Sequence, residues 1–122
     1  MLQTSKRILI IDDDVNTLEI IRKILEKKKY CISTSTNGAE ALAFLSKEKY
    51  EPDLVLVDIL MPTLCGYDVM RLLKDKLTKK VKIAYVSIVP KQEADLRGVD
   101  GFIQKPFSVG GLLKQVKVLI KK

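Results

Sequence analysis

The sequence predicts an α/β protein built on a parallel sheet with helices over both faces. Short apolar runs of strand length alternate with amphipathic stretches of helical periodicity from one end of the chain to the other. This alternation favours a parallel sheet, because each right-handed crossover between strands lays a helix against the sheet. The 122 residues contain no repeat, linker or low-complexity segment, so we expect one domain over residues 1–122.

The first part of the chain is expected to form two strands and two helices. Residues 6–11 predict a buried strand, and a helix then begins near Asp14. Residues 30–35 predict a short, more polar edge strand, which is followed by a helix from Asn37 to about Tyr50. The two helices carry apolar residues at helical spacing, namely Leu18, Ile21, Ile24 and Leu25 in the first, and Ala41, Leu42 and Leu45 in the second.

Three further strands are predicted at residues 54–58, 81–87 and 102–104. One helix follows Gly66, and Ser108 is a suitable N-cap for the last helix. The apolar residues of these two helices are Val69, Met70, Leu72 and Leu73, and then Leu112, Leu113, Val116, Leu119 and Ile120. The chain therefore consists of five βα units.

Polar side chains follow the apolar strands at the point where each strand ends. Asp12 and Asp13 follow the first strand, Asp58 the third, Ser87 ends the fourth, and Lys105 follows the fifth. In open parallel sheets, ligands bind outside the carboxyl ends of the strands. The sequence therefore predicts one site assembled from four strand ends.

The chemistry of these side chains indicates a magnesium-dependent phosphoryl site. Adjacent carboxylates repel one another unless a cation lies among them, and Mg²⁺ prefers oxygen ligands and keeps waters. Phosphoryl transfer depends mainly on positioning and charge neutralisation, and a carboxylate such as Asp58 can itself accept the group. Lys105 offers a positive charge to a phosphoryl oxygen and Ser87 a hydrogen bond. We assign Asp14 instead to the N-cap of the next helix.

The chain resembles the receiver domains of two-component response regulators, the CheY-like superfamily. The resemblance covers essentially the whole chain, and its motifs are specific in this order on these strand ends. They are Asp12-Asp13 after the first strand, Asp58-Ile59-Leu60-Met61-Pro62 after the third, Gly66, Ser87 at the end of the fourth strand, and Lys105-Pro106-Phe107.

The resemblance implies a five-stranded, doubly wound, flavodoxin-like sheet in the order 2-1-3-4-5 with five helices. It implies that Asp58 accepts a phosphoryl group from a partner histidine kinase, a phosphotransfer protein or a small phosphodonor. Mg²⁺ would be held by Asp12, Asp13, Asp58 and the backbone carbonyl of Leu60. Ser87, Lys105 and the aromatic switch residue Phe102 would then sense the phosphoryl group. Output to a downstream protein or effector domain would follow through the surface of the fourth helix, fifth strand and last helix.

Four features depart from the family pattern. Ile88 stands where the family usually has alanine or glycine, and its branched side chain is expected to narrow access to Asp58. Leu60 and Val89 occupy the positions that tune hydrolysis, and neither can orient a water by hydrogen bonding. The stretch from Ser87 to Lys105 is about one helical turn shorter than usual, so we expect a shortened or irregular fourth helix.

Three alternatives stay open from the residues. A degenerate receiver would bind partners without phosphorylation, but its acidic set should have decayed, and only Ile88 favours it. An aspartyl phosphohydrolase would need a second acid at position 60, where Leu60 stands. A mononucleotide-binding flavodoxin-like protein would need a phosphate-binding first loop, whereas the acids of that loop would repel phosphate without a metal.

The bulk composition limits the function classes. The formal charge of +7 suggests an acidic surface on the partner, but sparse aromatic residues and lysines placed at helix ends argue against nucleic-acid binding. No apolar run approaches a bilayer span, so membrane insertion is not expected. Cys31 and Cys65 have no metal-site spacing, which favours a reduced, cytoplasmic protein, and the lack of histidine excludes histidine-based catalysis.

Overall fold

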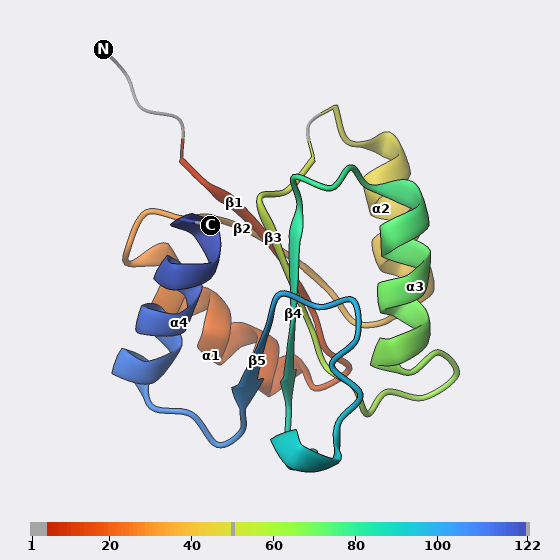
Figure 1. Ribbon diagram of the computed structural model, residues 1–122. Coiled ribbons are helices and arrows are strands. Elements are labelled where there is room, and N and C mark those ends of the chain that lie inside the picture. The colour runs from red at the N-terminus through yellow and green to blue at the C-terminus, as the bar shows by residue number, and fades with distance from the viewer. Residues whose placement is uncertain (1–4, 50, 122) are drawn as a thin grey trace.

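The computed structural model describes residues 5–49 and 51–121, which form a parallel sheet between two layers of helices (Figure 1). Its strand order is β2-β1-β3-β4-β5. The strands are β1 (Arg7–Ile11), β2 (Cys31–Ser35), β3 (Leu54–Val57), β4 (Lys82–Ser87) and β5 (Gly101–Gln104). The helical elements are α1 (Val15–Glu26), α2 (Gly38–Lys47), α3 (Gly66–Lys76), α4 (Val109–Lys121) and the single 3₁₀ turn η1 (Lys91–Glu93).

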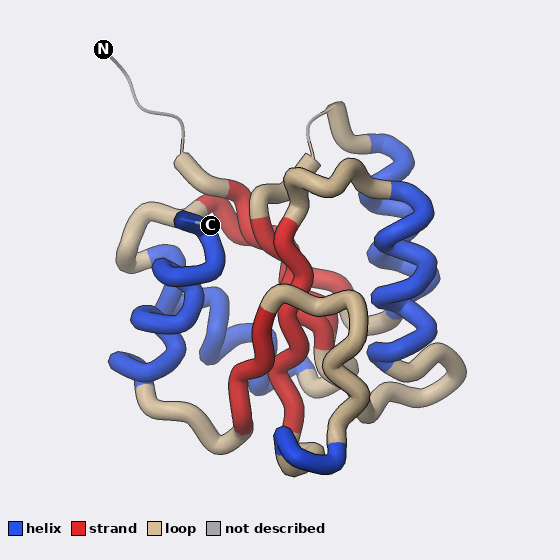
Figure 2. The backbone as a smooth tube through the Cα atoms, in the orientation of Figure 1, coloured by secondary structure: helices blue, strands red, loops and turns tan. Residues whose placement is uncertain are grey.

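The two faces of the sheet bury separate apolar cores. Figure 2 shows α1 and α4 on one face, with α2 and α3 on the other. Side chains alternate between the faces along each strand: on β1, Ile8 and Ile10 pack toward α1 and α4, whereas Leu9 and Ile11 pack toward α2 and α3. No helix among the described residues is long and apolar enough to span a bilayer.

The predicted α/β class, the sheet order and the shortened fourth helix are confirmed. Between β4 and β5 only η1 remains helical. The irregular chain around η1 still covers the core, because apolar side chains from it pack beside α3. These side chains are Val89, Ala94, Leu96 and Val99. The edge position of β2 agrees with its polar sequence.

Two details of the sequence prediction differ from the structure. Helix α2 ends at Lys47, so it stops short of Tyr50, which lies outside the described residues. On α3, Leu72 is 40% exposed, because the buried face follows Val69 and Leu73, four residues apart, and Leu72 lies beside that stripe.

Three polar residues begin helices as capping theory expects. The Asp14 carboxylate accepts hydrogen bonds from the Asn16 N–H at 3.1 Å and from the Thr17 hydroxyl at 2.7 Å. Asn37 accepts from the Glu40 N–H at 2.7 Å at the start of α2, and Ser108 accepts from the N–H of Gly111 at 2.9 Å at the start of α4. The three bonds from backbone N–H groups each satisfy a donor that the first helical turn leaves without a partner. The predicted capping roles of Asp14 and Ser108 are confirmed.

Gly66 allows α3 to begin directly against the end of β3. Its N–H donates to the Ile59 carbonyl at 2.7 Å. A Cβ at this position would lie 2.4 Å from the carbonyl oxygen of Asp58 and 2.6 Å from the Cα of Ile59. These are backbone atoms that cannot rotate away, so the close approach of Gly66 to the backbone of Asp58 and Ile59 requires glycine.

Replacing Gly66 with alanine is therefore expected to lower the free energy of unfolding by about 3 kcal/mol, because overpacking against backbone forces the loop to shift. Gly110→Ala is the matched control, since a Cβ at Gly110 meets nothing within 4 Å. That variant should be unchanged or more stable by up to about 1 kcal/mol, the helix-propensity difference. Urea denaturation of both variants measures the effect, and equal stabilities would contradict the packing argument.

Candidate functional site

Backbone hydrogen bonds just beyond the strands hold the candidate residues at the carboxyl edge of the sheet. Beyond the last ladder residues, the Asp12 N–H donates to the Ser35 carbonyl at 3.1 Å, and the Asp58 N–H donates to the Ile11 carbonyl at 2.9 Å. At the other side of the sheet, the Lys105 N–H donates to the Ser87 carbonyl at 2.9 Å. The strand-end residues are thus held by backbone bonds, and their side chains extend from a rigid frame.

Lys105 lies at the centre of the charged group. Its Nζ is 2.8 Å from Oδ2 of Asp12 and 3.5 Å from Oδ2 of Asp58. The Lys105 side chain is 14% exposed, and the two carboxylates are 3% and 9% exposed. One ammonium therefore contacts two nearly buried carboxylates that follow different strands. The sequence predicted that these residues lie at the same edge of the sheet, but not that they are in contact.

Burial and the neighbouring charges change the proton affinities of these groups. Burial raises the pKa of Asp58; the Lys105 charge opposes this and the Asp12 charge adds to it, so the pKa lies above its ordinary value. For Lys105, burial lowers the pKa, but the hydrogen bond and charge of Asp12 and the charge of Asp58 outweigh it, so the pKa is raised. The ammonium is held charged, while the ionised form of Asp58 is disfavoured.

Asp12, Asp13 and Asp58 form the cluster that suits a metal ion. Each offers a carboxylate oxygen, and these oxygens lie within 4.8 Å of one another. Asp12 and Asp58 are buried, whereas Asp13 is exposed at the rim. Oδ1 of Asp58 is buried and has no hydrogen-bond partner. Mg²⁺ prefers oxygen ligands, and this site offers a buried carboxylate oxygen without a partner beside two further carboxylates. The residues present therefore fit a magnesium ion.

Asp14 stands apart from this cluster. Its carboxylate caps α1, and the Thr17 hydroxyl bond lowers the pKa of Asp14. The Asp14 N–H donates to Oδ1 of Asp12 at 2.9 Å. Both oxygens of Asp12 are therefore engaged, one by this N–H and one by Lys105, which fixes the orientation of that carboxylate.

The two predicted switch residues are both buried. Ser87 is fully buried, and its Oγ accepts a hydrogen bond from the Val89 N–H at 3.2 Å. Phe102 is 8% exposed and packs in the core on the α2 and α3 side. Ser87 thus holds the start of the loop that follows β4, and Phe102 lies on the neighbouring strand.

The residues assigned to phosphate lifetime and access differ in their surroundings. Leu60 is 53% exposed and Ile88 is 63% exposed, although both are large apolar side chains. Val89 is partly buried against the core. Leu60 and Ile88 follow Asp58 and Ser87 closely in sequence, so the two strand ends carry exposed apolar side chains.

Gln104 is a positioning residue that the sequence analysis missed. Its Nε2 donates to the carbonyls of Ser87 at 3.0 Å and Val89 at 3.1 Å, and its Oε1 accepts from the Lys91 N–H at 3.1 Å. This amide fastens the β4–η1 loop to β5 immediately before Lys105. Its only sequence signal was a polar residue at the end of a short strand.

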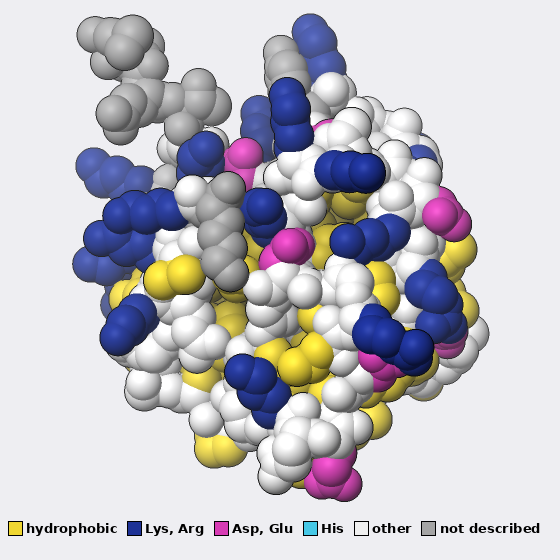
Figure 3. All heavy atoms as spheres, in the orientation of Figure 1, with side chains coloured by type: hydrophobic (Ala, Val, Ile, Leu, Met, Phe, Trp, Pro, Cys, Tyr) yellow, Lys and Arg dark blue, Asp and Glu magenta, His cyan; other side chains and the backbone are white. Residues whose placement is uncertain are grey.

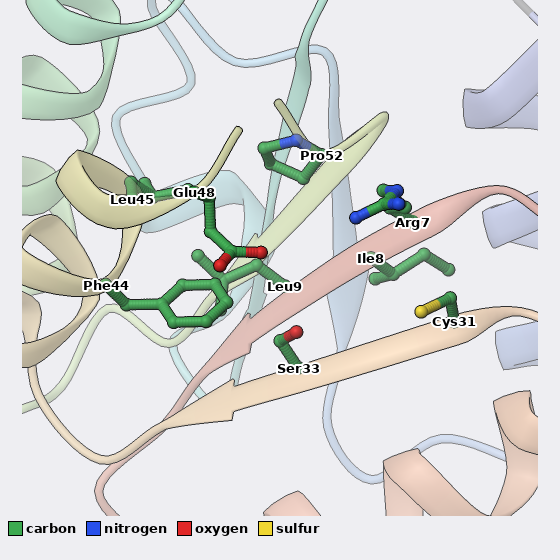
Figure 4. A pocket seen from close by; sticks show the side chains of 9 residues that line it. All are labelled: Arg7, Ile8, Leu9, Cys31, Ser33, Phe44, Leu45, Glu48 and Pro52. Carbon is green, nitrogen blue, oxygen red and sulfur yellow. The ribbon is translucent and has the colours of Figure 1, made fainter. Parts of the chain in front are cut away.

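A small cavity at the opposite edge of the sheet lies away from all of these groups (Figure 4). Phe44 and Glu48 reach from α2 toward Leu9 on β1 and Ser33 on β2. Its volume of about 20 Å³ is room for about one water molecule. None of the candidate site residues lines it.

Comparisons with known proteins agree with this geometry. A family model described as the response regulator receiver domain matches residues 8–117. The response regulator SaeR of Staphylococcus aureus is 31% identical over 121 residues, covering 94% of this chain and 50% of SaeR. The heme response regulator HssR of Staphylococcus saprophyticus is 29% identical over 116 residues, covering 93% of this chain and 51% of HssR. The chain thus spans about half the length of these curated relatives.

Solved structures show the same fold. The response regulator TrrA of Thermotoga maritima, solved in complex with Mg²⁺ and BeF, aligns with a TM-score of 0.82 and 33% identity, covering 93% of this chain and 98% of that chain. The chemotaxis protein CheY4 of Vibrio cholerae aligns with a TM-score of 0.83 and 25% identity, covering 95% of this chain and 99% of that chain.

Proposed function

Since the chain belongs to the response regulator receiver domain family, we propose that Asp58 is its phosphoacceptor and that residues 1–122 act as one receiver unit. The donor is a histidine kinase, a phosphotransfer protein or a small phosphodonor. The observation that carries the proposal is the convergence of Asp12, Asp58 and Lys105 from three strand ends. The intact acidic cluster argues against the degenerate alternative.

The transfer requires a carboxylate nucleophile whose negative charge is balanced. An oxygen of Asp58 attacks the phosphorus, the bond from phosphorus to the donor atom breaks, and the departing group keeps the electron pair. The product is an acyl phosphate on Asp58. Lys105 stays protonated through this step, because its two carboxylate neighbours raise its pKa, and it can donate to a phosphoryl oxygen.

Asp12, Asp13, Asp58 and the Leu60 carbonyl would hold Mg²⁺. When bound, the ion neutralises the negative charge that gathers between the carboxylates and the incoming phosphoryl group. The residues themselves contribute orientation: Asp12 is fixed by its two hydrogen bonds, and Gly66 fixes the backbone at Asp58.

A phosphoryl group on Asp58 would place new negative charge beside Lys105 and would favour a different conformation of the loop after β4. Ser87 Oγ accepts a bond from the Val89 N–H, and its hydroxyl also hydrogen-bonds Asp58, which lowers the pKa of that carboxyl. The hydroxyl would exchange this bond for one to a phosphoryl oxygen. A shift of Ser87 would be transmitted to Gln104, which bonds the Ser87 carbonyl, and so to Phe102 on the same strand. The surface of η1, β5 and α4 would then differ between the two states.

Incubation with acetyl phosphate or phosphoramidate and Mg²⁺ should add the mass of one phosphoryl group to the intact chain. Asp58→Asn should abolish this adduct, because the amide is a poor nucleophile. Asp53→Asn is a matched control, since Asp53 bonds the Arg7 N–H at the other end of the sheet, and it should be phosphorylated like the unmodified chain. Absence of an adduct with every donor would favour the degenerate receiver.

Slow loss of the phosphoryl group is expected, because the side chains of Leu60 and Val89 cannot orient water. Leu60→Asn should speed the loss by about tenfold, the effect of one hydrogen bond worth about 1.4 kcal/mol in the transition state. Leu60→Val is the apolar control and should leave the rate unchanged. The intact mass followed over time measures both rates. Loss within seconds from the unmodified chain, with no acceleration in Leu60→Asn, would show the idea to be wrong.

A further inference from the structure

Cationic side chains gather at the amino end of the sheet, where every α-helix of a parallel α/β unit ends and every strand begins. We define the basic end as the last turns of the α-helices, their connections to the next strand, and the strand starts. Among the described residues it holds fourteen cationic and six acidic side chains. The cationic ones are Lys6, Arg7, Lys23, Lys27, Lys28, Lys29, Lys47, Lys49, Lys74, Lys76, Lys79, Lys80, Lys82 and Lys121. The acidic ones are Glu26, Glu48, Glu51, Asp53, Asp75 and Asp100.

The remainder of the described chain has the opposite balance, with seven cationic and nine acidic side chains. Figure 3 shows many dark blue side chains over the upper part of the molecule, where α2 and α3 end in Figure 1, and a few others lower on the same face. The molecule is therefore strongly dipolar, with its positive end opposite the acidic cluster.

Most cations of the basic end are available to a partner. The ion pairs among the described residues outside this end use Arg22, Arg71, Arg97 and Lys105. Leaving Arg7 and Lys49 aside, no cation of the basic end forms an ion pair with another described residue.

Three of the six acids at this end are engaged by nearby groups. Glu51 accepts from the N–H and the hydroxyl of Thr78, Asp53 accepts from the Arg7 N–H, and Asp100 accepts from the Ile83 N–H. These neutral donors orient the carboxylates but leave them charged. The end presents mainly positive charge because its fourteen cationic side chains outnumber its six acidic ones.

Lys29 is a position at which the effect of charge can be separated from the effect of backbone fit. It ends the turn after α1 with φ of 66°, the left-handed conformation that suits glycine. A lysine in this conformation is strained, and its side chain is exposed with no packing role. Backbone fit alone would favour glycine, so the residue present adds a charge at a conformational cost.

We propose that the basic end docks on the anionic surface of a lipid bilayer. Thirteen of its fourteen cations are lysines, which act as point charges, whereas bidentate recognition of a phosphate or a base edge favours the planar guanidinium of arginine. Every aromatic side chain among the described residues is buried or partly buried, so these residues provide no exposed stacking platform for bases. The charges come from the ends of all four α-helices, which suits a broad, planar polyanion.

This orientation is compatible with the proposed function but does not depend on it. Docking through the amino ends of the strands leaves their carboxyl ends facing away from the bilayer. Asp58 and Lys105 would then stay open to a phosphodonor. The interaction is peripheral and reversible, because it rests on screened charges and not on apolar insertion.

Co-sedimentation with vesicles tests the proposal. The chain should bind phosphatidylcholine vesicles that contain about 30% phosphatidylserine, should not bind pure phosphatidylcholine, and should be released by about 0.5 M salt. The triple variant Lys27→Gln, Lys28→Gln, Lys29→Gln should bind about a hundredfold more weakly. Its matched control is Lys91→Gln, Arg97→Gln, Lys114→Gln, which removes the same charge elsewhere and should bind like the unmodified chain.

Lys29→Gly separates binding from folding. It should raise the melting temperature by relieving the left-handed lysine and yet weaken vesicle binding. The proposal is overturned by any of three results: no binding to anionic vesicles at physiological salt, equal losses in the two triple variants, or tighter binding to mixed-sequence duplex DNA than to the vesicles. Equal losses would mean that net charge suffices, and the DNA result would identify a different polyanion.

Discussion

The contact on which the site depends is the bridge from Lys105 to Asp12 and Asp58. One ammonium lies 2.8 Å from one nearly buried carboxylate and 3.5 Å from another, and the three residues follow three different strands. The parallel sheet order makes this possible, because β1 and β3 are neighbours and their carboxyl ends coincide. The charges at this site do not balance, because the one ammonium of Lys105 lies beside a cluster of three carboxylates, those of Asp12, Asp13 and Asp58. The site is therefore suited to accept a further cation. The pKa of Asp58 is raised mainly by its burial, with the Asp12 charge adding to this effect and the Lys105 charge opposing it.

Much of this arrangement was predictable from the sequence because it follows from strand ends. The apolar runs located the strands, parallel topology placed their carboxyl ends together, and the residue types at those ends indicated the chemistry. What the sequence could not predict depends on side-chain geometry. The amide of Gln104, which fastens the β4–η1 loop, and the contact of Gly66 with the Asp58 carbonyl require coordinates. The exposure of Leu72 was also missed, because helical spacing shows which face of α3 is apolar but not which residues at the border of that face are buried.

The same topology separates the two ends of the molecule chemically. Helices end and strands begin at the amino edge, where lysines complement the helix dipoles. Acids at the opposite edge follow the strands and form the candidate site. One edge thus concentrates negative charge around Asp58, and the other carries the excess of positive charge. Phosphorylation of Asp58 would add negative charge to the carboxyl edge without altering the basic end. The proposed docking on a bilayer and the phosphorylation can therefore be independent.

Thermal unfolding of Asp58→Asn in the metal-free state tests the charge imbalance most directly. With a chelator at neutral pH, this variant should be more stable than the unmodified chain, because burial raises the pKa of the Asp58 carboxyl and the uncharged amide avoids the cost of burying an ion. Added Mg²⁺ should stabilise the unmodified chain and reduce or reverse the difference. The control Asp75→Asn, on the exposed surface of α3, should leave the thermal stability unchanged both with chelator and with Mg²⁺. A less stable Asp58→Asn in chelator, or no response of the unmodified chain to Mg²⁺, would contradict the account.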